Sequence, residues 1–112
     1  MQSRKAAQET QFYWNIADDF LIRESVDEGS LMGFPCLRVH GEFFSTCEHR
    51  TSDLIVKLAK ERVTELIELG CGEAFAPAGR VFKEWVLVKQ RNKRAWNALM
   101  DEALNFVANK RK

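Results

Sequence analysis

The sequence predicts an α+β domain in which helices pack on an antiparallel sheet of about four strands. Hydrophobic residues alternate with a period of two in the middle of the chain and recur with the helical period near both ends. The 112 residues are 46% hydrophobic, which suits a single domain with one core. No linker-like stretch divides the chain, so we expect residues 1–112 to form one domain whose ends, 1–5 and 110–112, fray.

The first helix is predicted over residues 6–24, where neither Pro nor Gly occurs. Its hydrophobic stripe comprises Phe12, Tyr13, Ile16, Ala17, Phe20 and Leu21. Trp14 lies away from the centre of this stripe, so we expect it at the edge of the stripe or exposed. Residues 25–30 (SVDEGS) are polar and predict a mobile loop.

Three strands are predicted in the middle of the chain. Residues 36–40 and 42–47 alternate in polarity on either side of Gly41, which can adopt the positive φ that a tight hairpin requires. Residues 54–58 predict the third strand, because Leu54, Val56 and Leu58 fall on one face of it.

A second helix is predicted over residues 59–69, because Val63, Leu66 and Ile67 recur at helical spacing. Gly70 is placed to end this helix in the left-handed conformation. Residues 71–80 contain two glycines and Pro77, and they predict a loop.

A fourth strand and a long final helix are predicted in the C-terminal region. Residues 83–89 are rich in β-branched and aromatic side chains, and Asn92 is a candidate N-cap for the helix. The helix carries a stripe of six hydrophobic residues, Trp96, Leu99, Met100, Ala103, Leu104 and Val107. The predicted order of elements is therefore α-β-β-β-α-β-α.

Positive charge is concentrated at the C-terminal end. The net charge is only +1, but residues 83–112 hold 8 basic and 3 acidic side chains. Within them, Lys89, Arg91, Lys93 and Arg94 form a basic turn that could contact nucleic-acid phosphates, with Lys110, Arg111 and Lys112 as a further basic group. The competing interpretation is a solvated loop. Since the pI is about 7.7, the chain lacks the strongly basic balance of a dedicated nucleic-acid binder.

The cysteines and histidines predict no metal site. Cys36, Cys47 and Cys71 are odd in number and form no C-x-x-C pair, which is typical of reduced thiols in a cytoplasmic protein. In the run Cys47-Glu48-His49, neighbouring side chains of an extended chain point to opposite faces, which does not suit a shared metal ion.

No motif assembles a nucleophile with a base, and no phosphate-binding glycine loop occurs. We therefore expect no catalytic residue, no metal and no cofactor. No apolar run exceeds four residues, so we also expect no membrane segment, and a cytoplasmic location.

Residues 79–86 (GRVFKEWV) contain a compact charged and aromatic element made of Gly79, Arg80, Lys83, Glu84 and Trp85. In a functional interpretation, Arg80 and Lys83 would meet phosphate and Trp85 would stack on a base. In a structural interpretation, Trp85 belongs to the core or lies under a helix, while Lys83 and Glu84 point to opposite faces of a strand. The sequence favours the structural interpretation.

Residues 31–44 and 79–86, together with the helix end near Gly70, resemble the family of TfoX N-terminal domains and YjbR-like proteins. The resemblance covers residues 30–107 in order and spacing, and GR-x-x-KEW is its most specific element. It implies a small α+β domain with helices on an antiparallel sheet. Full-length TfoX proteins regulate bacterial competence and carry a second domain, and we do not expect that domain in this chain. The resemblance brings no catalytic residues.

These observations predict a non-enzymatic, cytoplasmic binding or regulatory module of the TfoX and YjbR-like kind. One alternative is weak DNA binding through the basic turn. Another is a protein-interaction or homodimerisation module that uses a strand edge or the first helix, and the off-centre position of Trp14 motivates it.

Overall fold

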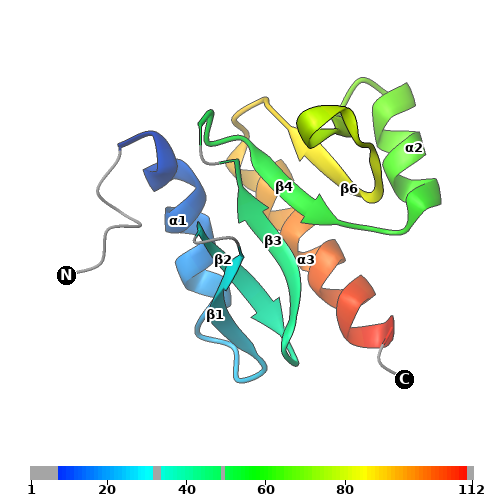
Figure 1. Cartoon of the computed structure of the whole chain (residues 1–112). Helices are drawn as coiled ribbons and strands as arrows, with labels where there is room; N and C mark the ends of the chain where they lie inside the picture. The colour runs from blue at the N-terminus through cyan, green and yellow to red at the C-terminus, as the bar shows by residue number, and fades with distance from the viewer. Residues whose placement is uncertain (1–7, 32–33, 49, 111–112) are drawn as a thin grey trace.

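The structure is a computed structural model that describes residues 8–31, 34–48 and 50–110. Along the chain, the elements are α1 (Gln8–Phe20), β1 (Val26–Leu31), β2 (Phe34–Val39), β3 (Glu42–Cys47), β4 (Leu54–Lys57), α2 (Lys60–Glu68), β5 (Glu73–Phe75), the 3-10 turn η2 (Pro77–Gly79), β6 (Phe82–Val88) and α3 (Lys93–Lys110). The strands form one sheet in the order β1-β2-β3-β4-β6-β5, and every pair is antiparallel (Figure 1). The predicted α+β class with an antiparallel sheet is confirmed.

The β2–β3 hairpin forms where the sequence predicts it. Val39 pairs with Glu42, so only His40 and Gly41 make the turn. Both have positive φ, 53° and 82°, as a type I′ turn requires. This turn matches the right-handed twist of the strands, so Gly41 fixes the register of the hairpin locally.

The prediction of a loop over residues 25–30 is wrong, because β1 forms there as the edge strand beside β2. Of the β1 side chains that the structure describes, Val26 alone joins the core, and an edge strand needs no hydrophobic alternation. Asp27 is paired across the strands with Arg38, at 2.7 Å between Oδ2 and Nη2. Residues 26–31 therefore form a strand because they pair with β2, and not because their own hydrophobic pattern favours one.

The sheet has six strands among the described residues, and not about four. The second additional strand, β5, occupies three residues within the predicted loop 71–80 and pairs with β6 through a shifted register. The observed order, α-β-β-β-β-α-β-β-α with η2 before the last strand, therefore differs from α-β-β-β-α-β-α. A three-residue strand is too short for a period of two to be recognised in the sequence.

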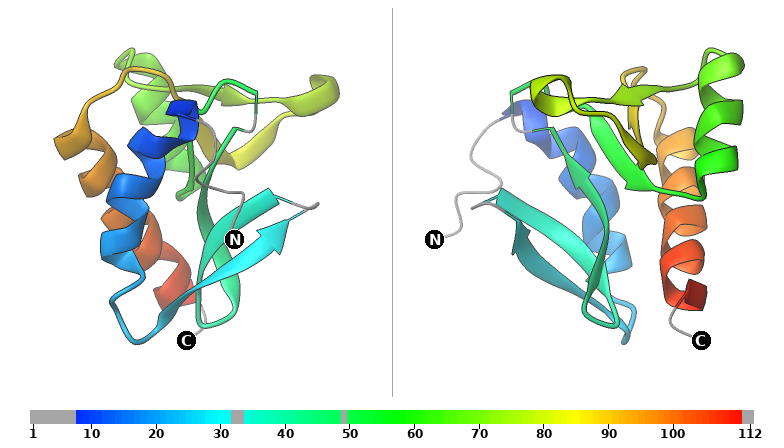
Figure 2. Two further views of the ribbon diagram at one scale, coloured as in Figure 1. Left: turned by 90° about the vertical axis from the view of Figure 1, so that its left-hand side faces the viewer. Right: turned by 45° about the vertical axis from the view of Figure 1, so that its right-hand side comes forward.

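Helices α1 and α3 lie side by side against one face of the sheet (Figures 1 and 2). All six residues of the predicted C-terminal stripe are buried, and α3 contacts β2, β3 and β4. Tyr13 of α1 reaches the sheet, where its hydroxyl hydrogen-bonds the Ser45 hydroxyl at 2.9 Å. Burial raises the pKa of Tyr13 well above its usual value and keeps this hydroxyl protonated.

Trp14 is buried at 1% exposure, so the alternative in which it is exposed is wrong. It belongs to the same core cluster as its neighbour Tyr13, and their rings meet edge to face at 5.0 Å. Helix α1 has the sheet on one side and α3 on another, so its buried face is wider than a single stripe.

Helix α2 packs against β6 and β5 at the far end of the sheet. Its C-terminus is a Schellman motif: the Cys71 N–H donates to the Leu66 carbonyl, and that of Gly70 to the Ile67 carbonyl. Gly70 has a φ of +78°, as predicted. Val63 and Leu66 are buried, but Ile67 is 40% exposed, so its assignment to the core-facing stripe is wrong.

At the C-terminus, Lys110 is the last residue of α3 and donates to Glu84 at 3.3 Å, contrary to the prediction that it frays. The predictions for residues 1–5 and 111–112 lie outside the described residues. Within the described ranges, no helix combines the length and the hydrophobicity needed to cross a membrane.

Candidate functional site

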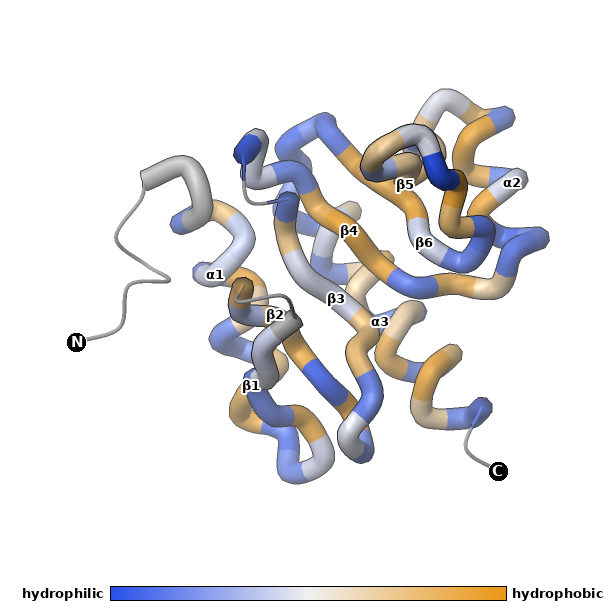
Figure 3. Tube along the Cα trace, viewed as in Figure 1, coloured by the Kyte–Doolittle hydropathy of each residue, from blue (hydrophilic) through white to orange (hydrophobic). Residues whose placement is uncertain are grey.

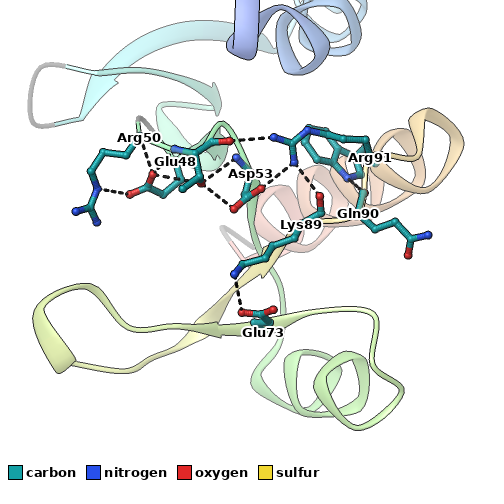
Figure 4. Close-up of polar contacts among 9 residues, drawn as sticks. Glu48, Arg50, Asp53, Glu73, Lys89, Gln90 and Arg91 are labelled. Atoms are coloured by element: carbon teal, nitrogen blue, oxygen red, sulfur yellow. Dashed lines mark hydrogen bonds and ion pairs between the residues drawn. The ribbon is translucent and has the colours of Figure 1, made fainter.

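Arg91, one of the four predicted nucleic-acid contacts, makes three hydrogen bonds within the protein (Figure 4). Its Nη1 donates to Asp53 Oδ1 and to the Lys89 carbonyl, both at 2.8 Å, and its Nη2 donates to the Thr51 carbonyl at 2.9 Å. The guanidinium also lies 5.2 Å from the centroid of the Trp96 ring. Arg91 therefore ties the β3–β4 connection to the β6–α3 connection.

The β3–β4 connection that Arg91 anchors is itself ordered by Glu48 (Figure 4). One oxygen of Glu48 accepts the backbone N–H groups of Arg50 and Thr51. Desolvation by burial opposes ionisation, but these hydrogen bonds and the Arg50 charge outweigh it and lower the pKa of Glu48. The Glu48 carboxylate therefore accepts hydrogen bonds from the backbone of this turn, which accounts for a glutamate next to Cys47.

The other three residues of the basic turn are not equivalent. Lys89 is ion-paired with Glu73 of β5 at 3.5 Å. Lys93 and Arg94 lie exposed in the first turn of α3 and form no ion pair with any residue that the structure describes. Asn92 caps this helix as predicted, because its Oδ1 accepts the N–H of Ala95 at 3.0 Å. The basic turn thus presents two free cations.

The three cysteines lie in different environments. Cys36 is buried and donates to the Phe34 carbonyl at 3.4 Å. Burial, reinforced by the charge of Glu48, raises the pKa of the Cys47 thiol to about 12, so the thiolate is disfavoured. Cys71 is exposed just beyond α2. His49 lies outside the described residues, and among those described no three His, Cys, Asp or Glu side chains cluster as metal ligands.

Some residues of the 79–86 element make contacts within the fold, and others are exposed to solvent. Gly79 ends η2 with a φ of +80°, and the Arg80 guanidinium lies 5.3 Å from the Phe82 ring centroid. Glu84 accepts from Lys110, which links β6 to α3. Lys83 is exposed. Trp85 is only half-buried, 5.9 Å from Lys57 Nζ, because the adjacent Val86 occupies the core position.

Lys83 and Trp85 meet α2 at a groove of about 430 Å³. The wall formed by α2 consists of Lys60, Glu61, Val63, Thr64 and Ile67. The opposite wall consists of Ala74, Val81, Phe82, Lys83 and Trp85. Figure 1 shows α2 beside β6 at this end of the sheet, and Figure 3 shows hydrophobic segments of both elements there. Phe75 packs on Phe82 at 5.8 Å between centroids and supports the aromatic wall.

Two cations and one carboxylate line this groove. Lys60 and Lys83 form no ion pair within the described part of the chain, and Glu61 is exposed beside Lys60. Arg80 adds a third positive charge next to Phe82. The groove therefore combines an apolar, partly aromatic floor with a net positive rim, a composition typical of sites that bind apolar anions.

The sequence indicated only half of this groove. The 79–86 element contains Lys83 and Trp85, which line one wall. The other wall is not indicated, because the helical spacing of Ile67 with Val63 and Leu66 predicts a buried side chain and not an exposed one. A sharper signal was available in residues 63–69, where Val63, Leu66, Ile67 and Leu69 exceed what one buried face of a nine-residue helix can cover.

Comparison with known proteins yields no relative: no protein-family model, no curated protein and no solved structure matches the chain.

Proposed function

We propose that the chain is a non-enzymatic, cytoplasmic binding or regulatory module of the kind its resemblance to TfoX N-terminal and YjbR-like domains implies. The groove between α2 and β6 is its ligand site. The observation that carries this proposal is an open apolar groove lined by two aromatic side chains, Phe82 and Trp85, and by two lysines that form no ion pair with a described residue.

The exposure of hydrophobic side chains supports this assignment. Ile67 and Val81, which line the groove, are 40% and 54% exposed. Complete burial of an exposed aliphatic side chain is worth about 1.5–3 kcal/mol, so a ligand that covers the exposed part of these two gains about half of that from each. Contiguous apolar surface on a small domain is typical of binding sites.

A titration with 1-anilinonaphthalene-8-sulfonate, an apolar anion, tests the groove. We expect saturable binding of one dye, with energy transfer from Trp85, which is the half-buried tryptophan, whereas Trp14 and Trp96 are buried. Val81→Asp should abolish the binding. Ile22→Asp is the matched control, because Ile22 is 82% exposed and does not line the groove.

Equal loss in both variants, or no binding to the wild type, would contradict the groove as ligand site. Turnover of a defined substrate by the purified protein would contradict the non-enzymatic assignment.

A second proposal is weak DNA binding at the start of α3. It rests on Lys93 and Arg94, which are exposed and form no ion pair in the part of the chain that the structure describes. Fluorescence anisotropy with a labelled duplex should show binding that weakens steeply with salt, and Lys93→Glu with Arg94→Glu should remove it. Arg91 is unsuitable for this test, because its loss would disturb the fold. Unchanged affinity of the double variant would exclude this site.

Pairing through α1 loses its motivation, because Trp14 is inside the core. A dimer would instead have to use the sheet edges at β1 or β5, or the groove itself.

A further inference from the structure

We propose that the groove between α2 and β6 binds an acidic peptide segment with an apolar anchor. This inference rests on the proposed function and names its ligand: a short stretch of a protein partner in which aliphatic or aromatic side chains are flanked by Asp or Glu.

The apolar surface of the groove favours a ligand with an apolar anchor. Of the large hydrophobic side chains that the structure describes as exposed, Ile67 and Val81 line the groove. They are 40% and 54% exposed and come from α2 and from the residue before β6, so one anchor side chain that enters the groove can cover both. A peptide presents such a side chain on its backbone, which lets the neighbouring residues reach the rim.

The charges favour an acidic segment. Lys60 on α2 and Lys83 on β6 come from opposite walls, so carboxylates on either side of an apolar anchor would each meet a cation. Arg80, over the Phe82 ring, is available to a further carboxylate. Such charge complementarity directs recognition and speeds association more than it adds affinity.

The carboxylates of α2 disfavour a nucleic acid as the ligand. Glu61 lines the groove, and α2 also contains Glu65 and Glu68. Glu65 is ion-paired with Arg62 at 2.9 Å. Glu61 lines the groove and forms no ion pair with a residue that the structure describes, so its negative charge is not compensated there. A continuous phosphate backbone would have to pass these carboxylates, whereas a peptide can place its acidic residues selectively.

The test uses fluorescence anisotropy with labelled synthetic peptides and the full chain. The probe has a central Phe-Leu pair flanked by Asp. Two controls replace either the Asp residues with Lys or the Phe-Leu pair with Gly-Gly. A labelled oligo-dT strand is the nucleic-acid control. Far-UV circular dichroism and thermal melting establish that each protein variant folds like the wild type.

We expect the acidic Phe-Leu peptide to bind more tightly than either control, with affinity that falls as salt rises. Lys60→Glu and Lys83→Glu should each weaken it by about two- to fivefold, and Glu61→Lys should strengthen it by a similar factor. Lys93→Glu, an equal charge change at an exposed residue of α3, should leave the affinity unchanged.

Equal binding of the Lys-containing peptide or of the Gly-Gly peptide would overturn the inference, as would oligo-dT binding that Lys83→Glu removes. Dye binding without binding of any peptide would also overturn it and leave the proposed function standing. Loss of dye and peptide binding together would overturn both.

Discussion

At the scale of single residues, Arg91 shows that a cation in a basic cluster can be structural. It donates hydrogen bonds to Asp53 and to two carbonyl groups, and Asp53 is itself 6% exposed. A buried carboxylate that loses its partner keeps its desolvation cost, so this contact is worth more than a surface ion pair. Arg94, three residues later, has no such partner among the described residues.

Arg91→Ala should therefore lower the free energy of unfolding by about 1–3 kcal/mol. Arg94→Ala removes the same type of side chain from an exposed position and should change it by less than about 0.5 kcal/mol. Urea denaturation followed by tryptophan fluorescence compares the two. Equal effects would show that the Arg91–Asp53 contact does not anchor the β3–β4 connection.

At the scale of elements, the helix ends and the hairpin obey local rules. Asn92 caps α3, the Schellman motif at Gly70 ends α2, and the His40-Gly41 turn joins β2 to β3. Each depends on residues within a few positions of one another, so each was predicted correctly from the sequence. The cap of α3 also positions a candidate site, because Lys93 and Arg94 follow Asn92 directly.

Gly70→Ala should destabilise the protein by about 1 kcal/mol, because a Cβ disfavours the left-handed conformation. Nothing lies within 4 Å of the position that this Cβ would occupy, so the effect is one of backbone conformation alone. Gly70→Asn should cost less, since Asn tolerates positive φ. Thermal unfolding measures all three proteins, and an alanine variant as stable as the wild type would refute this account of the α2 terminus.

At the scale of the whole molecule, one hydrophobic core joins elements that are distant in sequence. Val63 and Leu66 of α2 belong to the same cluster as the buried faces of α1, α3 and the sheet. The end of the molecule that carries the groove is therefore not a separate unit. The β1 edge and the β5 edge lie at opposite ends of the sheet that this core supports (Figure 2).

Met100→Ala, at a fully buried position of α3, should cost about 2–5 kcal/mol in free energy of unfolding. Because there is one core, tryptophan fluorescence and far-UV circular dichroism should report a single coincident transition. Asn105→Ala, on the exposed side of the same helix, is the control and should be nearly neutral. Two separate transitions would show that α2 and β5–β6 unfold independently.

The candidate site was only partly predictable, since Lys83 and Trp85 stood out as a motif but their partner wall on α2 did not. Ile67 has helical spacing with Val63 and Leu66, and periodicity alone cannot say where a buried stripe ends. That limit depends on how closely α2 approaches β6, which is a property of packing.

By itself, the sequence determined the fold class, the hairpin, the helix caps and the buried stripe of α3, because these follow from interactions among near neighbours in the chain. Only the tertiary structure decided that residues 26–31 form a strand, that Trp14 is buried, that Arg91 is held by Asp53 and that α2 and β6 leave a groove. Each of these depends on contact with another element of the fold, which the packing of the folded core sets and which no pattern within one element encodes.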